Sequence, residues 1–183
     1  MDLNEKQIID GCKARNSHSQ ALLYKGYASA LFGMACRYTP CEADAEDVLH
    51  DAFLKIFENI GQYNGKASIR AWMVKIVINE ALTLHKSRNM HPTENFDDYE
   101  EEITDYSVTE SDMLTHEILL KFIQDLPHGY RMAFNLCEIE GYSYDEVAKM
   151  LNCTASTCRS QLFKAKNILR EKVNEFNKKE KFL

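Results

Sequence analysis

The chain has 183 residues, of which 45% are hydrophobic, and a formal net charge of −6. This length suits one ordinary domain or two small ones, and the hydrophobic content excludes an intrinsically disordered protein. Seven Gly and three Pro are too few for a sandwich or barrel of many short strands, so we expect an all-α protein.

Signals for membranes, secretion and metals are lacking. No apolar run is long enough to span a bilayer, and the N-terminus has no basic stretch followed by an apolar run. We therefore expect a cytoplasmic protein without membrane insertion. The six cysteines do not have the paired spacing of zinc sites, so we expect neither a metal nor a cofactor.

Helical periodicity predicts four helices in the first half of the chain. They cover residues 3–14, 17 to about 40, 41–60 and 69–87, with a loop over 61–68. Ser17 with Gln20 fits a capping box for the second helix. Thr39 fits the N-cap of the third helix, with Pro40 in its first turn and Glu42 completing a capping box.

Residues 91–111 are rich in acids and hydroxyls and have no helical stripe, which predicts a flexible linker. Helical periodicity resumes over 112–125, and Pro127 separates this segment from another helix over 128–140.

A short helix, a tight turn and a second helix follow. Gly141 can close the preceding helix in the left-handed conformation, and Ser143 with Glu146 has the spacing of a capping box. Asn152 and Cys153 then form the turn, and Thr154 can cap a long last helix. This arrangement is typical of a DNA-binding helix-turn-helix, while an ordinary helical hairpin with a solvated basic face is the alternative.

Residues 134–169 resemble the C-terminal helix-turn-helix of bacterial sigma factors, most closely the extracytoplasmic-function group of the sigma-70 family. The first half agrees independently. Residues 44–48 and 51–53 resemble the core-binding helix of that family, and residues 71–73 with Asn79 resemble its promoter-melting segment. The resemblance covers nearly the whole chain.

The resemblance implies a domain over 1–90 that is similar to sigma region 2, the acidic linker over 91–111, and a domain over 112–183 that is similar to sigma region 4. The expected function is a subunit that binds core RNA polymerase, directs it to specific promoters and helps to melt DNA. The expected partners are core RNA polymerase and promoter DNA, and an anti-sigma factor is a further candidate because many relatives are held by one.

The resemblance also assigns candidate residues to three surfaces. The polymerase-binding surface comprises Asp44, Glu46, Asp47, Asp51 and Phe53. The surface for the minus-ten element comprises Tyr63, Asn64, Lys66, Ser68, Asn79, Lys86 and Arg88. The surface for the minus-thirty-five element comprises Tyr130, Arg131, Thr157, Arg159, Ser160, Gln161, Phe163, Lys164 and Lys166.

Some positions depart from the usual pattern of the family. Ser156 and Cys158 stand where Gly and Val are common, and Gln161, Lys164 and Lys166 stand where Arg is common. Lys does not reproduce the planar fork of Arg, so the promoter sequence that is read does not follow from the resemblance.

Three other functions are weighed against this one. A stand-alone helix-turn-helix regulator would bind DNA without polymerase, usually as a dimer. Asp47, His50 and Asp51 fall within one turn, but a metal site also needs ligands from a second element. An enzyme is not expected, because no phosphate loop, nucleophile elbow or zinc motif is present.

The negative charge is concentrated between the two halves. Residues 1–90 carry a balance of +1, residues 91–117 carry −10, and residues 118–183 carry +3. From Thr154 onward the balance is +5. The overall −6 therefore does not argue against DNA binding, since both expected DNA-binding regions are neutral to basic.

Overall fold

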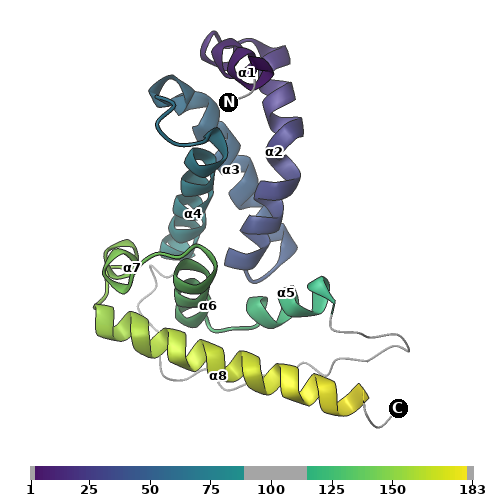
Figure 1. The fold of residues 1–183 in the computed structure, drawn as a ribbon, viewed down its shortest axis with the longest axis vertical. Helices are drawn as coiled ribbons and strands as arrows, with labels where there is room; N and C mark the ends of the chain where they lie inside the picture. Colours follow the sequence, from purple (N-terminus) through teal and green to yellow (C-terminus); the bar gives the residue numbers. More distant parts are fainter. Residues whose placement is uncertain (1–2, 89–114, 181–183) are drawn as a thin grey trace. The chain divides into compact units, whose positions relative to one another are not determined.

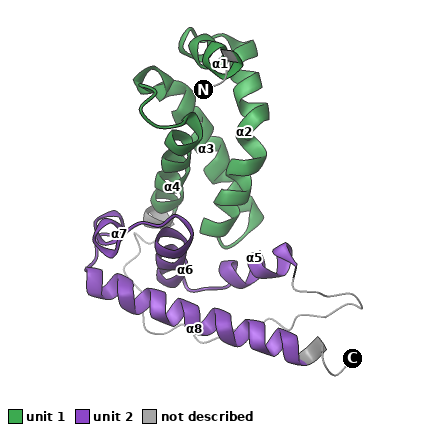
Figure 2. Ribbon diagram, in the orientation of Figure 1, with its two compact units in different colours: residues 1–90 green, residues 91–183 purple. Residues whose placement is uncertain are grey.

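The computed structural model describes residues 3–88 and 115–180, and the predicted linker over 91–111 lies outside them. The chain divides into two units, Met1–Met90 and His91–Leu183 (Figure 2). Every regular element in the described residues is helical, which confirms the all-α class (Figure 1). Within residues 3–88 and 115–180, no helix is both long and apolar enough to cross a membrane.

Unit 1 is built on three long helices that pack against one another. Its elements are α1 (Leu3–Lys13), α2 (Ser17–Tyr38), α3 (Glu42–Asn59), the 3-10 helix η1 (Ile60–Gln62) and α4 (Ile69–Arg88). Leu31, Ile56 and Met73 come from α2, α3 and α4 in turn, and all are at most 1% exposed. The bundle therefore buries one apolar stripe from each long helix. Helix α1 packs on α2.

Two predicted caps in unit 1 are wrong. Helix α2 is capped by Asn16 rather than Ser17, because the Asn16 side chain accepts a backbone N–H of the first turn at 3.0 Å. Thr39 is the C-cap of α2, and its hydroxyl donates to the carbonyl oxygen of Ala35 at 3.0 Å. Helix α3 begins after Cys41, which forms no side-chain cap. A threonine hydroxyl can bond backward or forward along the chain, so spacing alone did not decide its partner.

Unit 2 contains the helix-turn-helix. Its elements are α5 (His116–Gln124), α6 (His128–Phe134), the π-helical turn η2 (Asn135–Ile139), α7 (Tyr144–Leu151) and α8 (Ala155–Glu180). The single helix expected over 128–140 thus widens into a π turn after Phe134. Helix α8 packs against both α6 and α7, and Met132, Leu136 and Val147 are fully buried in this unit.

The turn chemistry of unit 2 follows the prediction. Gly141 has φ of +78°, and Ser143 and Glu146 form both bonds of a capping box. Asn152 ends α7 in the left-handed conformation with φ of +53°. Thr154 then caps α8, because its hydroxyl oxygen accepts the Thr157 N–H at 3.1 Å. These local bonds set the start of each helix and so place the first turns of α8 on the surface.

Candidate nucleic-acid interface

The first half of α8 presents one buried side and one exposed side. Cys158, Leu162 and Ala165 are at most 3% exposed and face α6 and α7. Phe163 is 66% exposed, the largest exposed fraction among the large hydrophobic side chains described. Ser156, Thr157, Arg159, Ser160 and Lys164 are also exposed. A solvent-exposed aromatic ring among hydroxyls and cations suits contacts to base edges and phosphates.

Neighbouring helices contact the cations of this surface. The Arg159 guanidinium lies 5.2 Å from the ring centre of Tyr144, and the Lys164 ammonium lies 5.6 Å from that of Tyr130. Lys166 forms an ion pair with Glu138 at 2.6 Å. The structure therefore brings Tyr130, Arg159, Lys164 and Lys166 of the predicted set onto one surface. It adds Tyr144 and Glu138, which are not among the predicted site residues.

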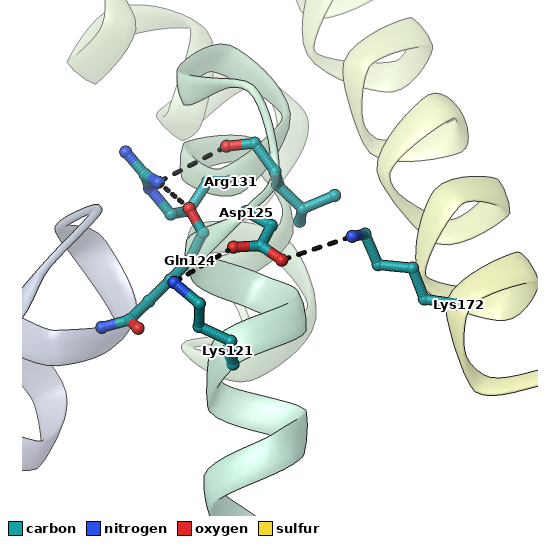
Figure 3. A network of polar contacts seen from close by, with 6 residues as sticks. Lys121, Gln124, Asp125, Arg131 and Lys172 are labelled. Atoms are coloured by element: carbon teal, nitrogen blue, oxygen red, sulfur yellow. Dashed lines mark hydrogen bonds and ion pairs between the residues drawn. The ribbon is translucent and has the colours of Figure 1, made fainter. Parts of the chain in front are cut away.

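The expectation that Arg131 belongs to the DNA-binding surface is corrected by the structure. Arg131 is only 5% exposed, and its guanidinium donates to the carbonyl oxygens of Gln124 and Leu126 at the end of α5. Figure 3 shows this contact beside the ion pairs of Asp125 with Lys121 and Lys172. The charge of Arg131 is used inside the unit, where it satisfies helix-end carbonyls, and so it is not placed to bind a DNA phosphate.

Gln161 is also partly withdrawn from the surface. A Cβ atom on Gly129 would lie 2.6 Å from the Gln161 amide nitrogen, so the Gln161 side chain rests against the first turn of α6. Its amide oxygen is buried and has no hydrogen-bond partner among the described residues. Thr157 remains exposed, with its hydroxyl 2.9 Å from that of Thr154.

In unit 1 the predicted polymerase-binding residues fall into two groups. Glu46, Asp47 and Asp51 are exposed on α3. Asp44 and Phe53 are only 6% and 4% exposed. The ring centre of Phe53 lies 4.6 Å from that of Tyr24. The expectation that Asp44 and Phe53 bind polymerase is therefore corrected, because both lie in the interior rather than on a docking surface.

The loop before α4 contains one further correction. Tyr63 is 6% exposed, its hydroxyl donates to the carbonyl oxygen of Ala67 at 2.7 Å, and its ring lies 5.7 Å from that of Trp72. It supports the loop from beneath instead of forming its rim. The Asn64 side chain accepts the Lys66 N–H at 3.1 Å, an internal bond that shapes the turn.

The other minus-ten candidates are spread along α4. Ser68 caps the helix by accepting the Ala71 N–H at 3.2 Å. Asn79 is exposed about three turns further on. Lys86 and Arg88 belong to the last turns of α4, and their side chains lie outside the described residues. The structure therefore groups Asn64, Lys66 and Ser68 at one end of α4 and leaves Asn79 apart from them.

Asp47, His50 and Asp51, the alternative metal ligands, are all exposed on α3. Among the described residues, no group of three or more His, Cys, Asp or Glu side chains is placed to hold a metal ion.

Two models of one family match the chain. The model described as Sigma-70 region 2 matches residues 23–90, and the model described as Sigma-70, region 4 matches residues 116–169. They occur in the order expected from the sequence, one in each unit of the structure.

Curated relatives match over almost their full length. The chain is 27% identical over 182 residues to the ECF RNA polymerase sigma-E factor of Escherichia coli, covering 93% of this chain and 95% of the relative. It is 27% identical over 176 residues to the RNA polymerase sigma-H factor of Pseudomonas aeruginosa, covering 90% and 91%. The sigma-E factor of Haemophilus influenzae is 25% identical over 182 residues, covering 93% and 96%.

Solved structures share the fold. The sigma factor RpoE of Bartonella quintana, solved with the anti-sigma factor NepR, has a TM-score of 0.54 at 21% identity, covering 84% of this chain and 96% of that one. CnrH, solved with the cytosolic domain of CnrY, has a TM-score of 0.51 at 18% identity, covering 93% and 97%. With both family regions in order and relatives matched end to end, the chain belongs to the extracytoplasmic-function group of the sigma-70 family.

Proposed function

We propose that this chain binds core RNA polymerase, directs it to specific promoters and helps to melt promoter DNA. The single observation that carries the proposal is the presence of both sigma-70 regions in one chain, in family order. A stand-alone regulator would need only the helix-turn-helix. Proteins of this family act by binding, and the proposal requires no catalytic group.

The exposed face of α8 is proposed to read the minus-thirty-five element. Arg159, Ser160, Phe163 and Lys164 lie on its solvent side, and from Thr154 onward the charge balance is +5. Positive charge supplies the affinity for DNA phosphates, while hydroxyl and apolar groups on a recognition helix contact base edges. Tyr130, Thr157 and Lys166 lie at the border of the same face, where phosphates pass.

The acidic face of α3 is proposed to bind core RNA polymerase. Glu46, Asp47 and Asp51 are exposed there, and none of the ion pairs between described residues uses them. Such charges are available to a basic partner surface, where they steer association and fix register.

The loop and the start of α4 are proposed to hold the opened minus-ten strand. Asn64, Lys66 and Ser68 are exposed on a loop that Tyr63 and Trp72 support from below. Exposed polar groups on a loop that aromatic rings support fit the capture of unpaired nucleobases. Asn79, Lys86 and Arg88 extend the proposal along α4.

An anti-sigma factor is proposed as a regulatory partner. Two solved structures of the same fold contain a partner: RpoE is in complex with the anti-sigma factor NepR, and CnrH is in complex with the cytosolic domain of CnrY. The segment 91–111 is proposed as an acidic linker that enters a basic channel of the polymerase, in keeping with its concentration of Asp and Glu.

Transcription in vitro tests the proposal. Bacterial core RNA polymerase with this protein should produce transcripts whose start sites share two upstream sequence elements, and neither component alone should do so. A protein that selects the same DNA without polymerase, and does not change the start sites of the polymerase, would be the stand-alone regulator instead.

A further inference from the structure

Two tyrosines from different helices lie beneath the two exposed cations of α8. Tyr144 is the first residue of α7 and Tyr130 lies in α6, and both are half-buried. Their ring centres are 5.2 Å from the Arg159 guanidinium and 5.6 Å from the Lys164 ammonium. Each cation thus rests on an aromatic ring of a helix that is packed against α8.

The two contacts are on opposite borders of the exposed face. Lys164 is five positions after Arg159, so their side chains leave α8 about 140° apart. Ser156, Ser160 and Phe163 lie between them on the helical projection, and all three are exposed. One ring therefore restrains a cation on each side of the central strip.

We infer that Tyr144 and Tyr130 are positioning residues of the recognition surface, whose rings hold Arg159 and Lys164 over the borders of α8 before DNA arrives. The inference rests on the proposed function of α8. Long cationic side chains lose rotamer freedom when they bind, and a ring that already restrains them reduces that loss. The attraction between a cation and an aromatic face supplies the restraint.

The ring, rather than the hydroxyl, carries this role at Tyr144. Within residues 115–180 no hydrogen bond involves the Tyr144 hydroxyl, whereas its ring face meets the guanidinium. Phenylalanine keeps that face and leucine removes it. The pair Y144F and Y144L therefore separates the ring from both the hydroxyl and the general apolar packing.

The test is a double-mutant cycle on the holoenzyme. The probe is a fluorescent promoter duplex recovered by selection with the wild-type holoenzyme from DNA randomised across the minus-thirty-five region. We expect Y144L to weaken binding about 3- to 10-fold and Y144F to stay within about 2-fold of wild type. In an R159A background, Y144L should add less than about 2-fold, because the side chain that it positions is gone.

Several outcomes would overturn the inference. Unchanged or tighter binding by Y144L would do so, as would an equal loss in the R159A background or a Y144F variant as weak as Y144L. Unfolding midpoints of the variants identify a loss that comes only from a destabilised α7. If R159A itself leaves binding unaltered, the proposed reading face is wrong, and this result is distinct from failure of the tyrosine contact. The same cycle applies to Tyr130 and Lys164.

Discussion

The acidic face of α3 and the basic face of α8 use charge in different ways. Glu46, Asp47 and Asp51 extend from α3 without an ion pair to any described residue. On α8, by contrast, Arg159 and Lys164 rest on rings and Lys166 is paired with Glu138. Unrestrained charge suits long-range attraction to a partner protein, and restrained charge suits the reading of a fixed pattern.

Charged groups lie in the interior of both units. In unit 2 the buried Arg131 of α6 donates to carbonyl oxygens at the end of α5. In unit 1 Asp44 is buried on α3 beside Ala45, and the buried Glu80 of α4 is paired with Lys55 of α3 at 2.6 Å. The two faces therefore differ in how their surface charges are restrained, and not in whether the unit beneath them contains charge.

The largest expected effect follows from removing the buried guanidinium. R131A leaves helix-end carbonyls unsatisfied and should lower the free energy of unfolding of unit 2 by roughly 2–3 kcal/mol. Urea unfolding of the full chain, monitored by amide hydrogen exchange in α5 and α6, measures this loss. If R131A unfolds like wild type, Arg131 is not structural, and its assignment to DNA phosphates returns.

Neutralising the α3 face should slow polymerase binding without affecting the fold. We expect the triple variant E46Q/D47N/D51N to associate with core polymerase about 10-fold more slowly at low salt, with a weaker salt dependence. Stopped-flow association measures the rate. The control is D10N/E171Q/E175Q, which makes the same change in net charge at exposed positions elsewhere. Equal slowing by both triples would mean that only total charge matters.

High pH should weaken unit 2 through Cys158. Burial, with a contribution from the neighbouring Cys153 thiol, raises the pKa of Cys158 to about 12. Because the folded state holds the proton more tightly, the stabilisation is complete below the unfolded-state pKa and is lost as pH rises from about 9 toward 12. We expect a loss of roughly 1 kcal/mol at pH 10 relative to pH 8. C158V should lack this part of the pH dependence; an identical pH profile would contradict the assignment.

The smallest expected effect concerns the ion pair at the border of the α8 face. E138Q frees Lys166 from its partner and removes a negative charge beside the DNA path, so promoter affinity should rise about 2- to 3-fold. The slope of log affinity against log salt concentration should steepen by the amount expected for about one more released counterion. Fluorescence anisotropy at several salt concentrations measures both. Weaker binding by E138Q would show that Glu138 orients Lys166 productively.

The helix starts of unit 2 are more predictable from the sequence than those of unit 1. The Ser143–Glu146 spacing located the start of α7 correctly, since both bonds of a capping box depend only on local sequence. At Thr39 the same kind of spacing misled, because the hydroxyl bonds to Ala35 in the preceding helix. A capping-box spacing therefore predicts a helix start reliably where no carbonyl oxygen of a preceding helix competes for the hydroxyl.

Sequence alone determined the helical class, the helix-turn-helix and the separation of acidic from basic segments, because periodicity, turn chemistry and charge are local properties. Only the tertiary structure decided which polar and aromatic side chains are covered. The sequence predicts surface positions for Tyr63 and Arg131, yet neighbouring elements bury both. Tyr144 is not among the predicted site residues, yet its ring meets Arg159. Helical spacing gives the direction in which a side chain leaves its helix, but the packed neighbour decides whether it meets solvent, a carbonyl or a ring.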